Sequence, residues 1–249
     1  ESSTPSANSE RAGKHVIDRV PYVKAPEETA GDKRFLSRDE LSRLFRASRV
    51  ATWPIDAKTP APLWWRGIWV LDSTYGLRPS DLVKICDHHA GLRWKAWHRD
   101  PECPNPRLNC RNQLGWLTFT PKNNDGPKPR PLHLPITPAF DAVLREIERF
   151  HPQHSGDGLI FPSSRSNHQF HEQRKRICAE AEIDPSVWLQ HLRQTAGDRW
   201  DRIRMGLGRF VLGHAPRDVN STHYRNPARP LARFVSKLKE PSAFLELVG

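Results

Sequence analysis

The sequence lacks any long hydrophobic run: no stretch of about 18 apolar residues occurs, and no signal-peptide h-region is found. Nothing therefore favours a membrane partner. Cysteine is also scarce, with only Cys86, Cys103, Cys110 and Cys178 in 249 residues. This number excludes a disulfide-dense secreted scaffold. We expect a protein of a reducing, intracellular (cytoplasmic, nucleoid-associated) setting.

Acidic residues are outnumbered by basic ones. The chain has 39 Lys and Arg against 28 Asp and Glu, which gives a net charge of +11 and a pI near 9.9. Such an excess favours a polyanionic partner, most often nucleic acid. The alternatives are an acidic membrane surface and a basic soluble protein without such a partner.

The chain begins with a polar stretch, which is followed by patterns typical of regular secondary structure. Residues 1–33 contain scattered Pro and Ser without apolar periodicity, so we expect a flexible linker or arm. A capping box of Ser37 and Glu40 predicts a helix start. Residues 61–76 are apolar almost all round, which predicts a core helix that breaks at Gly76. Pro79 then suits the first turn of a helix over residues 79–86.

The middle of the chain has the pattern of a small sheet. Residues 91–97, 115–121 and 130–136 are expected strands, and the turn between the last two contains Asn124, Asp125 and Gly126. Most of the remaining sequence is predicted to be helical. We therefore expect an α+β fold, mostly helical, with a small three-stranded antiparallel sheet.

Five polar residues stand out in chain order: Arg78, Lys122, Arg193, His214 and Tyr224. Each has a plain structural interpretation. Arg78 could pair with a nearby carboxylate, Arg193 could form a surface ion pair, His214 could cap a helix, and Tyr224 could be a half-buried aromatic residue. Together in this order the five residues are difficult to explain as separate structural features.

In this order the residues resemble the tyrosine recombinase (phage integrase-like) family over about residues 34–240. The matching positions are Arg78 and Asp81 in "YGLRPSDL", Lys122 in "PKNNDGPKPRPLHLP", Gln190 and Arg193 in "QHLRQT", His214 in "LGH", and Tyr224. The resemblance implies a catalytic domain over residues 34–249 that ends in a tail from about residue 225. It also implies that residues 1–33 are too short and too polar to be the family's separate core-binding domain.

The resemblance implies a mechanism as well. Tyr224 would attack phosphorus and form a 3′-phosphotyrosyl bond, Lys122 would protonate the leaving 5′ oxygen, and His214 would hydrogen-bond the phosphate. Arg78 and Arg193 would hold the phosphate, and Asp81 would orient Arg78 or its helix. We expect a metal- and ATP-independent site-specific recombinase or integrase of a mobile genetic element, with no cofactor.

One position departs from the family pattern. The residue three places before Arg193 is usually His or Lys, and here it is Gln190, with His191 one place later. One step along a helix turns a side chain by about 100°. We therefore favour Gln190 as the residue that fills this position, as a hydrogen-bonding group. The alternative is a backbone shift that brings His191 in.

Residues 98–113 have the character of an insertion between the first two expected strands. Cys103 and Cys110 lie within it and, with His98, would be candidate zinc ligands. A disulfide between the two cysteines is another possibility. The favoured interpretation is a basic loop that faces DNA, without a metal.

The resemblance also implies double-stranded DNA as partner, and a homo-tetramer on paired sites for the full-length protein. In the family the tail docks on a neighbouring subunit, whereas the alternative is a tail packed on its own domain.

Two functions other than recombination fit the same residues. A topoisomerase of type IB has these residues but does not bring two DNA sites together. A non-catalytic DNA-binding relative of the recombinases is the third candidate, and Gln190 is the only feature that favours it.

Overall fold

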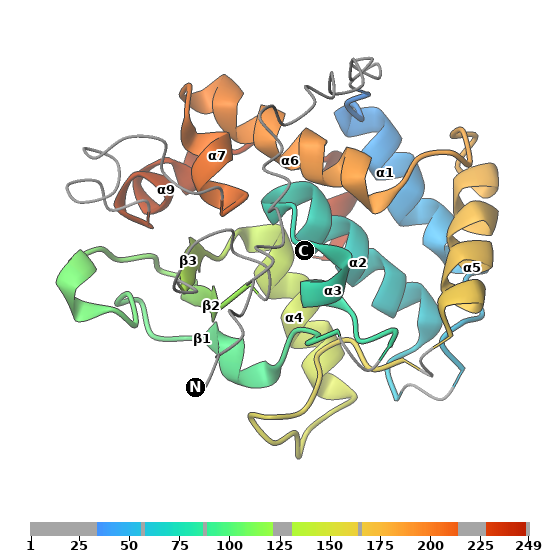
Figure 1. Cartoon of the computed structure of the whole chain (residues 1–249), viewed down its shortest axis with the longest axis horizontal. Coiled ribbons are helices and arrows are strands. Elements are labelled where there is room, and N and C mark those ends of the chain that lie inside the picture. The colour runs from blue at the N-terminus through green and yellow to red at the C-terminus, as the bar shows by residue number, and fades with distance from the viewer. Residues whose placement is uncertain are drawn as a thin grey trace, which may run out of the picture. The chain divides into compact units, whose positions relative to one another are not determined.

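The computed structural model describes residues 34–55, 58–86, 89–121, 131–163, 166–213 and 228–247. The chain divides into two compact units, Glu1–Asp32 and Lys33–Gly249. The first unit, and with it the expected arm, lies outside the described residues. Figure 1 shows the elements, which in chain order are α1 (Arg38–Ala47), η1 (Ser48–Val50), α2 (Ala61–Tyr75), α3 (Pro79–Leu82), η2 (Trp94–Ala96), β1 (Trp97–His98), η3 (Pro106–Leu108), β2 (Trp116–Phe119), β3 (Leu132–Pro135), α4 (Pro138–Arg149), α5 (Asn167–Glu180), α6 (Leu189–Ile203), α7 (Leu207–Val211), α9 (Ala228–Phe234), η4 (Val235–Lys237) and η5 (Ser242–Leu247).

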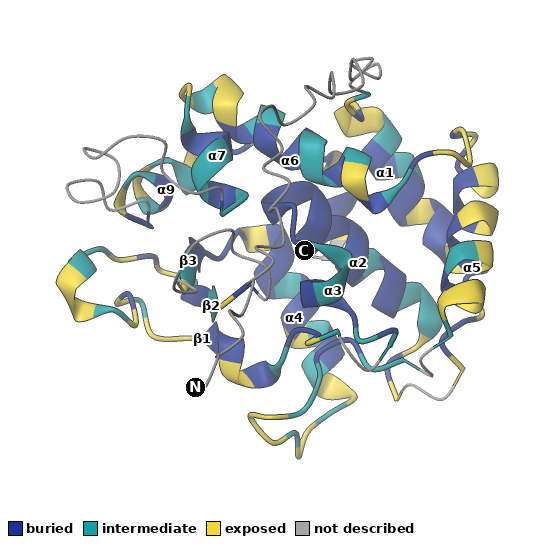
Figure 2. Ribbon diagram, in the orientation of Figure 1, coloured by how far each residue is buried: buried dark blue, intermediate teal, exposed yellow. Residues whose placement is uncertain are grey.

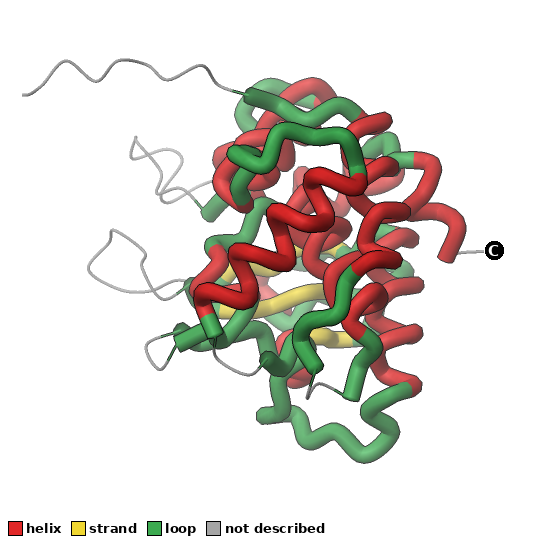
Figure 3. Tube along the Cα trace, turned by 90° about the vertical axis from the view of Figure 1, so that its right-hand side faces the viewer, coloured by secondary structure: helices red, strands yellow, loops and turns green. Residues whose placement is uncertain are grey.

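The fold class is α+β, as predicted. The strands β1, β2 and β3 form an antiparallel three-stranded sheet in chain order, in which Leu117 of β2 lies opposite Leu134 of β3. Figure 3 shows the short strands side by side among the helices. A sheet this small cannot bury its own apolar faces, so the helices must cover it.

Helix α2 forms the centre of the core, which confirms the core helix predicted for residues 61–76. Its side chains Trp64, Trp65 and Trp69 are fully buried, and Figure 2 shows the helix in dark blue along most of its length. A helix that is apolar all round must be covered on every side. Neither α2 nor any other helix in the described ranges is long and apolar enough to cross a membrane.

Helix α1 begins at the predicted capping box. The hydroxyl of Ser37 accepts a hydrogen bond from the backbone N–H of Glu40 at 3.1 Å. In return, the Glu40 carboxylate accepts one from the backbone N–H of Ser37 at 2.7 Å. These two bonds satisfy donors that would otherwise lack a partner at the helix start.

Two predicted elements are wrong in extent. The strand expected over residues 91–97 is reduced to β1, because the backbone N–H groups of Trp94 and Lys95 donate to the loop carbonyls of Gly158 and Gly156 and not to β2. The helix expected over residues 79–86 ends at Leu82, because the next residue takes an extended conformation. The pattern of residue types did not show that the backbone N–H groups of Trp94 and Lys95 have hydrogen-bond partners outside the sheet.

Strand β2 separates two hydrophobic clusters. Leu117 lies in the main core, whereas Trp116 belongs to a small second cluster with Cys103 and Ala228. Both side chains are fully buried, although neighbouring residues of a strand point to opposite faces. One face of the sheet packs against the main core. The loop before β2 and helix α9, near the start of the C-terminal tail, therefore cover the opposite face.

The C-terminal tail packs on its own domain over residues 228–247. Phe244 is fully buried, and its ring centroid lies 5.3 Å from that of Phe45 in α1. Nearby, Glu246 pairs with Arg46 at 2.6 Å. These contacts lie within one chain, and the docking of the tail on a neighbouring subunit stays a prediction.

This packing predicts the effect of truncating Phe244. We expect Phe244→Ala to lower the free energy of unfolding by about 3–5 kcal/mol, because a buried ring leaves a cavity. The matched control is Leu245→Ala at the exposed neighbour, which should change it by less than about 0.5 kcal/mol. Urea unfolding at two protein concentrations measures both. A midpoint that depends on concentration in the wild type, and loses that dependence in Phe244→Ala, would show that the tail docks on another copy.

Candidate functional site

The last turn of α2 is held by side chains from α6. The final carbonyls of any helix have no partner within it. Here three of these carbonyls accept hydrogen bonds from side chains of α6. Arg199 Nη1 donates to Ser73 at 2.8 Å and Trp200 Nε1 donates to Thr74 at 2.8 Å. Arg193 Nη1 donates to Gly76. The phenol of Tyr75 donates to the carbonyl of Pro135 at 2.8 Å, at the end of β3. The turn thus ties two helices and the sheet together.

Gly76 lets the chain leave this turn. It adopts a left-handed conformation with φ of 60°. A Cβ at Gly76 would also lie only 3.1 Å from Cα of Arg193, so a side chain would force α2 and α6 apart. Leu77 is buried, and Arg78 is the extended residue before α3. The glycine therefore sets where Arg78 emerges relative to Arg193.

Arg193 joins two of the predicted motifs. Its guanidinium donates through Nη1 to Gly76, in the first motif, and through Nη2 to the carbonyl of Leu212 at 2.7 Å, in the "LGH" motif. Gly213 follows with φ of 67° and ends the described part of that segment. Because both bonds use the outer nitrogens of one planar group, the two segments hold the guanidinium in a fixed plane.

A pocket opens where these segments meet. Its wall consists of Leu77, Arg78, Asp81, Phe119, Pro121, Leu132, Arg193, Val211, Leu212 and Gly213. The structure therefore brings together Arg78, Asp81 and Arg193, which are 115 residues apart in sequence at most (193 − 78). Asp81 is buried. The pocket also contains the residues immediately before Lys122 and His214.

The electrostatics of the pocket favour an anion. Burial, and next the charge of Arg78, lower the pKa of the Arg193 guanidinium from its usual value. The carboxylates of Asp72 and Asp81 oppose this shift. Two like charges that disfavour one another gain stability when a negative group lies between them. A phosphate oxygen is such a group.

Three predicted site residues, Lys122, His214 and Tyr224, lie outside the described residues. Residues that directly precede two of them are described. Pro121 and Gly213, which directly precede Lys122 and His214, line the pocket. Tyr224 comes four residues before Ala228, where α9 begins. The roles of these three side chains remain predictions.

Gln190 and His191 both lie on the first turn of α6, and neither belongs to the pocket wall. Gln190 is exposed. His191 Nδ1 accepts a hydrogen bond from the backbone N–H of Trp188 at 2.9 Å, so the imidazole caps its own helix. The structure thus places neither residue at the pocket, and which of the two fills the family's histidine position stays a prediction.

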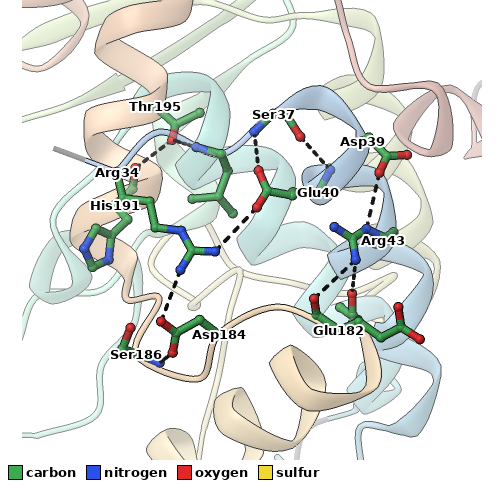
Figure 4. A network of polar contacts seen from close by, with 12 residues as sticks. Arg34, Ser37, Asp39, Glu40, Arg43, Glu182, Asp184, Ser186, His191 and Thr195 are labelled. Carbon is green, nitrogen blue, oxygen red and sulfur yellow. Dashed lines mark hydrogen bonds and ion pairs between the residues drawn. The ribbon is translucent and has the colours of Figure 1, made fainter. Parts of the chain in front are cut away.

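Residues from the N-terminal part of the described chain also hold the start of α6 in place (Figure 4). Thr195 Oγ1 accepts from the backbone N–H of Leu36 at 2.9 Å and donates to the carbonyl of His191 at 2.7 Å. Arg34 reaches Asp184, before α6, at 3.3 Å, and Glu40 of α1 at 3.5 Å. These contacts fix the helix on which Arg193 lies.

The zinc alternative has no support among the described residues. In these ranges no group of three or more His, Cys, Asp or Glu side chains is placed to hold a metal ion. His98 lies on β1, where burial lowers its pKa and where its charge acts on His133. Cys103 and Cys110 lie near one another without it.

Sequence reasoning missed Asp72 and Arg199. Asp72 is fully buried in α2, and burial raises the pKa of its carboxyl well above the usual range, against the charge of Arg193. A lone aspartate in an otherwise apolar helix was the available signal. Arg199 had none, because its partners are backbone carbonyls and Glu240 of the tail.

Comparison with known proteins gives one similar structure. No family model and no curated protein sequence matches the chain. The chain is similar to a crystal structure of the XerH site-specific recombinase bound to difH substrate, a pre-cleavage complex, with a TM-score of 0.48 and 17% identity. The similarity covers 82% of this chain and 54% of that chain, so this chain spans about half of that recombinase. At this score and identity the similarity assigns no activity.

The capping bond of His191 predicts a purely structural effect of its removal. We expect His191→Ala to lower the free energy of unfolding by about 1 kcal/mol, as the loss of a helix cap does. The matched control is Gln190→Ala, which removes an exposed side chain and should change stability by less than about 0.5 kcal/mol. Thermal unfolding of the three proteins checks this. Equal stability of His191→Ala and wild type would contradict the capping role.

Proposed function

We propose that the chain is the catalytic region of a site-specific DNA recombinase or integrase of the tyrosine type. The observation that carries the proposal is the pocket in which Arg78 and Arg193 meet, bounded by the residues next to Lys122 and His214. Two guanidinium groups from distant parts of the chain converge where the resemblance expects a scissile phosphate.

The two arginines act on the charge of the phosphate. A phosphodiester is an anion, and the pentacoordinate transition state carries more negative charge on its oxygens. Guanidinium groups match two such oxygens with paired donors. Because Arg193 is already oriented by Gly76 and Leu212, its charge needs no rearrangement when the transition state forms. Asp81, buried beside Arg78, orients this part of the pocket.

The covalent step follows the resemblance. The phenol oxygen of Tyr224 attacks phosphorus, the bond from phosphorus to the 5′ oxygen breaks, and Lys122 gives its proton to that oxygen. A tyrosine has a pKa near 10 in water, so the nucleophile needs the positive field of the arginines and a nearby base that takes the phenol proton. His214 donates a hydrogen bond to the phosphate. The phosphotyrosyl bond retains the energy needed for rejoining, so ATP is not consumed and no metal is needed.

The partner in this proposal is double-stranded DNA, in agreement with the net charge of +11. The element it would serve is a mobile genetic element, and the full-length protein would act as a homo-tetramer on paired sites. The reaction would take place in the cytoplasm, at the nucleoid. Each of these statements depends on the resemblance.

A second candidate is a topoisomerase of type IB, which uses the same chemistry on one duplex. A tail that docks on a neighbouring subunit would favour the recombinase, whereas a topoisomerase needs no such contact. Relaxation of a supercoiled plasmid that has no target site would distinguish this activity from recombination. A non-catalytic relative is the third candidate, and it predicts binding without cleavage.

The proposal is tested with a suicide substrate. Nicked duplexes that carry candidate sites are mixed with the full-length protein without metal, and the products are separated on a denaturing gel. We expect a covalent protein–DNA band in the wild type and none in Tyr224→Phe, which keeps the ring but has no nucleophile. A mobility-shift assay on the same duplexes is the control for binding. Binding without a covalent band on any site would contradict the proposal and favour the non-catalytic relative.

Gln190 predicts a slow enzyme that a single substitution improves. An amide donates a hydrogen bond but cannot transfer a proton at neutral pH. We expect Gln190→His to raise the rate of covalent-band formation by about tenfold or more, within the range of general acid–base catalysis. Gln194→His, one turn of α6 away on a half-buried position, is the matched control. A similar gain from both variants would mean that added histidine acts through DNA binding alone.

A further inference from the structure

The loop between β1 and β2 places two cysteines opposite one another. We call residues 99–113 the cysteine loop. Glu102 and Arg111 form an antiparallel bridge within it, and the backbone N–H of Cys103 donates to the carbonyl of Cys110 at 3.0 Å. Residues paired in this way have Cα atoms about 5.5 Å apart. That separation lies within the range of about 4.4–6.8 Å that a disulfide requires.

The two side chains also lie in one cluster. Both cysteines are free, Cys103 is buried and Cys110 is half-buried. Cys110 packs against the small cluster that Cys103 forms with Trp116 and Ala228. The other cysteines of the chain, Cys86 and Cys178, do not belong to this cluster. Two cysteines that are paired across neighbouring strands, one of them partly accessible to solvent, are placed to form an intrachain disulfide without backbone rearrangement.

We infer that Cys103 and Cys110 are a redox-sensitive dithiol, which a small-molecule disulfide converts into an intrachain disulfide. The thiolate of Cys110, the accessible residue, attacks a sulfur of the oxidant and expels one thiolate. Cys103, as thiolate, then attacks the mixed disulfide at Cys110 and expels the second. The two cysteines lose two electrons and two protons in total, and the oxidant is reduced to two thiols.

The position of the pair gives this reaction a consequence. Cys103 packs with Trp116 of β2 and Ala228 of α9, and Cys110 and Ala232 lie at the edge of the same cluster. Trp116 also donates through Nε1 to the carbonyl of Pro101 at 3.0 Å, which ties the cysteine loop to β2. The loop therefore supports two elements at once.

Both supported elements lead to predicted catalytic residues. Strand β2 ends at Phe119, shortly before Lys122, and α9 begins four residues after Tyr224. A disulfide holds its sulfur atoms about 2.05 Å apart and fixes the torsion angles of both side chains. Closing the pair therefore changes how the Cys103 side chain packs against Trp116 of β2 and Ala228 of α9. This last step rests on the proposed function, whereas disulfide formation does not.

The environment of Cys110 sets the rate of oxidation. Burial, and next the neighbouring Cys103 thiol, raise the pKa of Cys110 above its usual range. A thiol with a raised pKa has a smaller thiolate fraction at neutral pH, and only the thiolate attacks. The oxidation rate should therefore still rise with pH between about pH 7 and 9, by roughly tenfold per unit. At neutral pH the pair reacts slowly and remains reduced without an oxidant.

The test uses the full-length protein, oxidised glutathione at pH 8.5 and peptide mapping by mass spectrometry. We expect one intrachain link between Cys103 and Cys110, with Cys86 and Cys178 still thiols, and slower hydrogen exchange in residues 228–234 of the oxidised protein. The matched control is Cys103→Ser, in which Cys110 should stop at the mixed disulfide. A stable glutathione adduct on the wild-type Cys110, or no reaction at all, would refute the dithiol. Unchanged exchange in α9 after full oxidation would refute the coupling.

The suicide-substrate assay then links the pair to the site. We expect oxidation to lower the rate of covalent-band formation by about tenfold, because displacements of about 1 Å at a reacting group have effects of this size or larger. Dithiothreitol should restore the rate. Cys103→Ser cannot form the disulfide, so its rate should not show this loss. An oxidised protein as fast as the reduced one would refute the regulation. Absence of cleavage in the reduced protein would refute the proposed function, while the mass and exchange measurements decide the dithiol independently.

Discussion

The structure depends on how the final carbonyl groups of α2 are satisfied. This helix is buried, so water cannot supply hydrogen bonds to its last turn, and each unpaired carbonyl there would be costly. Side chains of α6 supply them, two from arginines and one from a tryptophan. Because long polar side chains replace water at this point, α2 and α6 are locked in one register. That register determines the positions of Arg193 and Arg78.

The same constraint explains why Arg193 belongs to both the fold and the site. Its outer nitrogens hold the carbonyls of Gly76 and Leu212, while its charge lies beside that of Arg78. A buried guanidinium needs compensation, and the carboxyls of Asp72 and Asp81 provide part of it. Burial holds the pKa of the Asp72 carboxyl well above its usual range, so Asp72 offsets the positive charge of the two guanidiniums only in part.

The sequence was sufficient for local features and for the order of the motifs. The capping box of Ser37, the apolar helix that ends at Gly76 and the small sheet followed from spacing alone. The meeting of Arg78 and Arg193 was predictable only through the resemblance, because no local rule brings residues so distant in sequence together. Backbone partners were not predictable: Trp94 and Lys95 donate to a distant loop, and His191 turns back to its own helix. Such contacts leave no periodic signal.

Strand β2 shows how one sheet can serve two purposes. Leu117 faces the main core, where burial of apolar surface stabilises the arrangement of α2 and α6, whereas Trp116 faces a small cluster of the cysteine loop and α9. A cluster this small contributes little to overall stability and can change its packing without unfolding the domain. The elements next to Lys122 and Tyr224 rest on that cluster, while the two arginines rest on the main core. In the proposed function, the two arginines would thus be held by the main core, whereas regulation through the small cluster would act on the side of Lys122 and Tyr224.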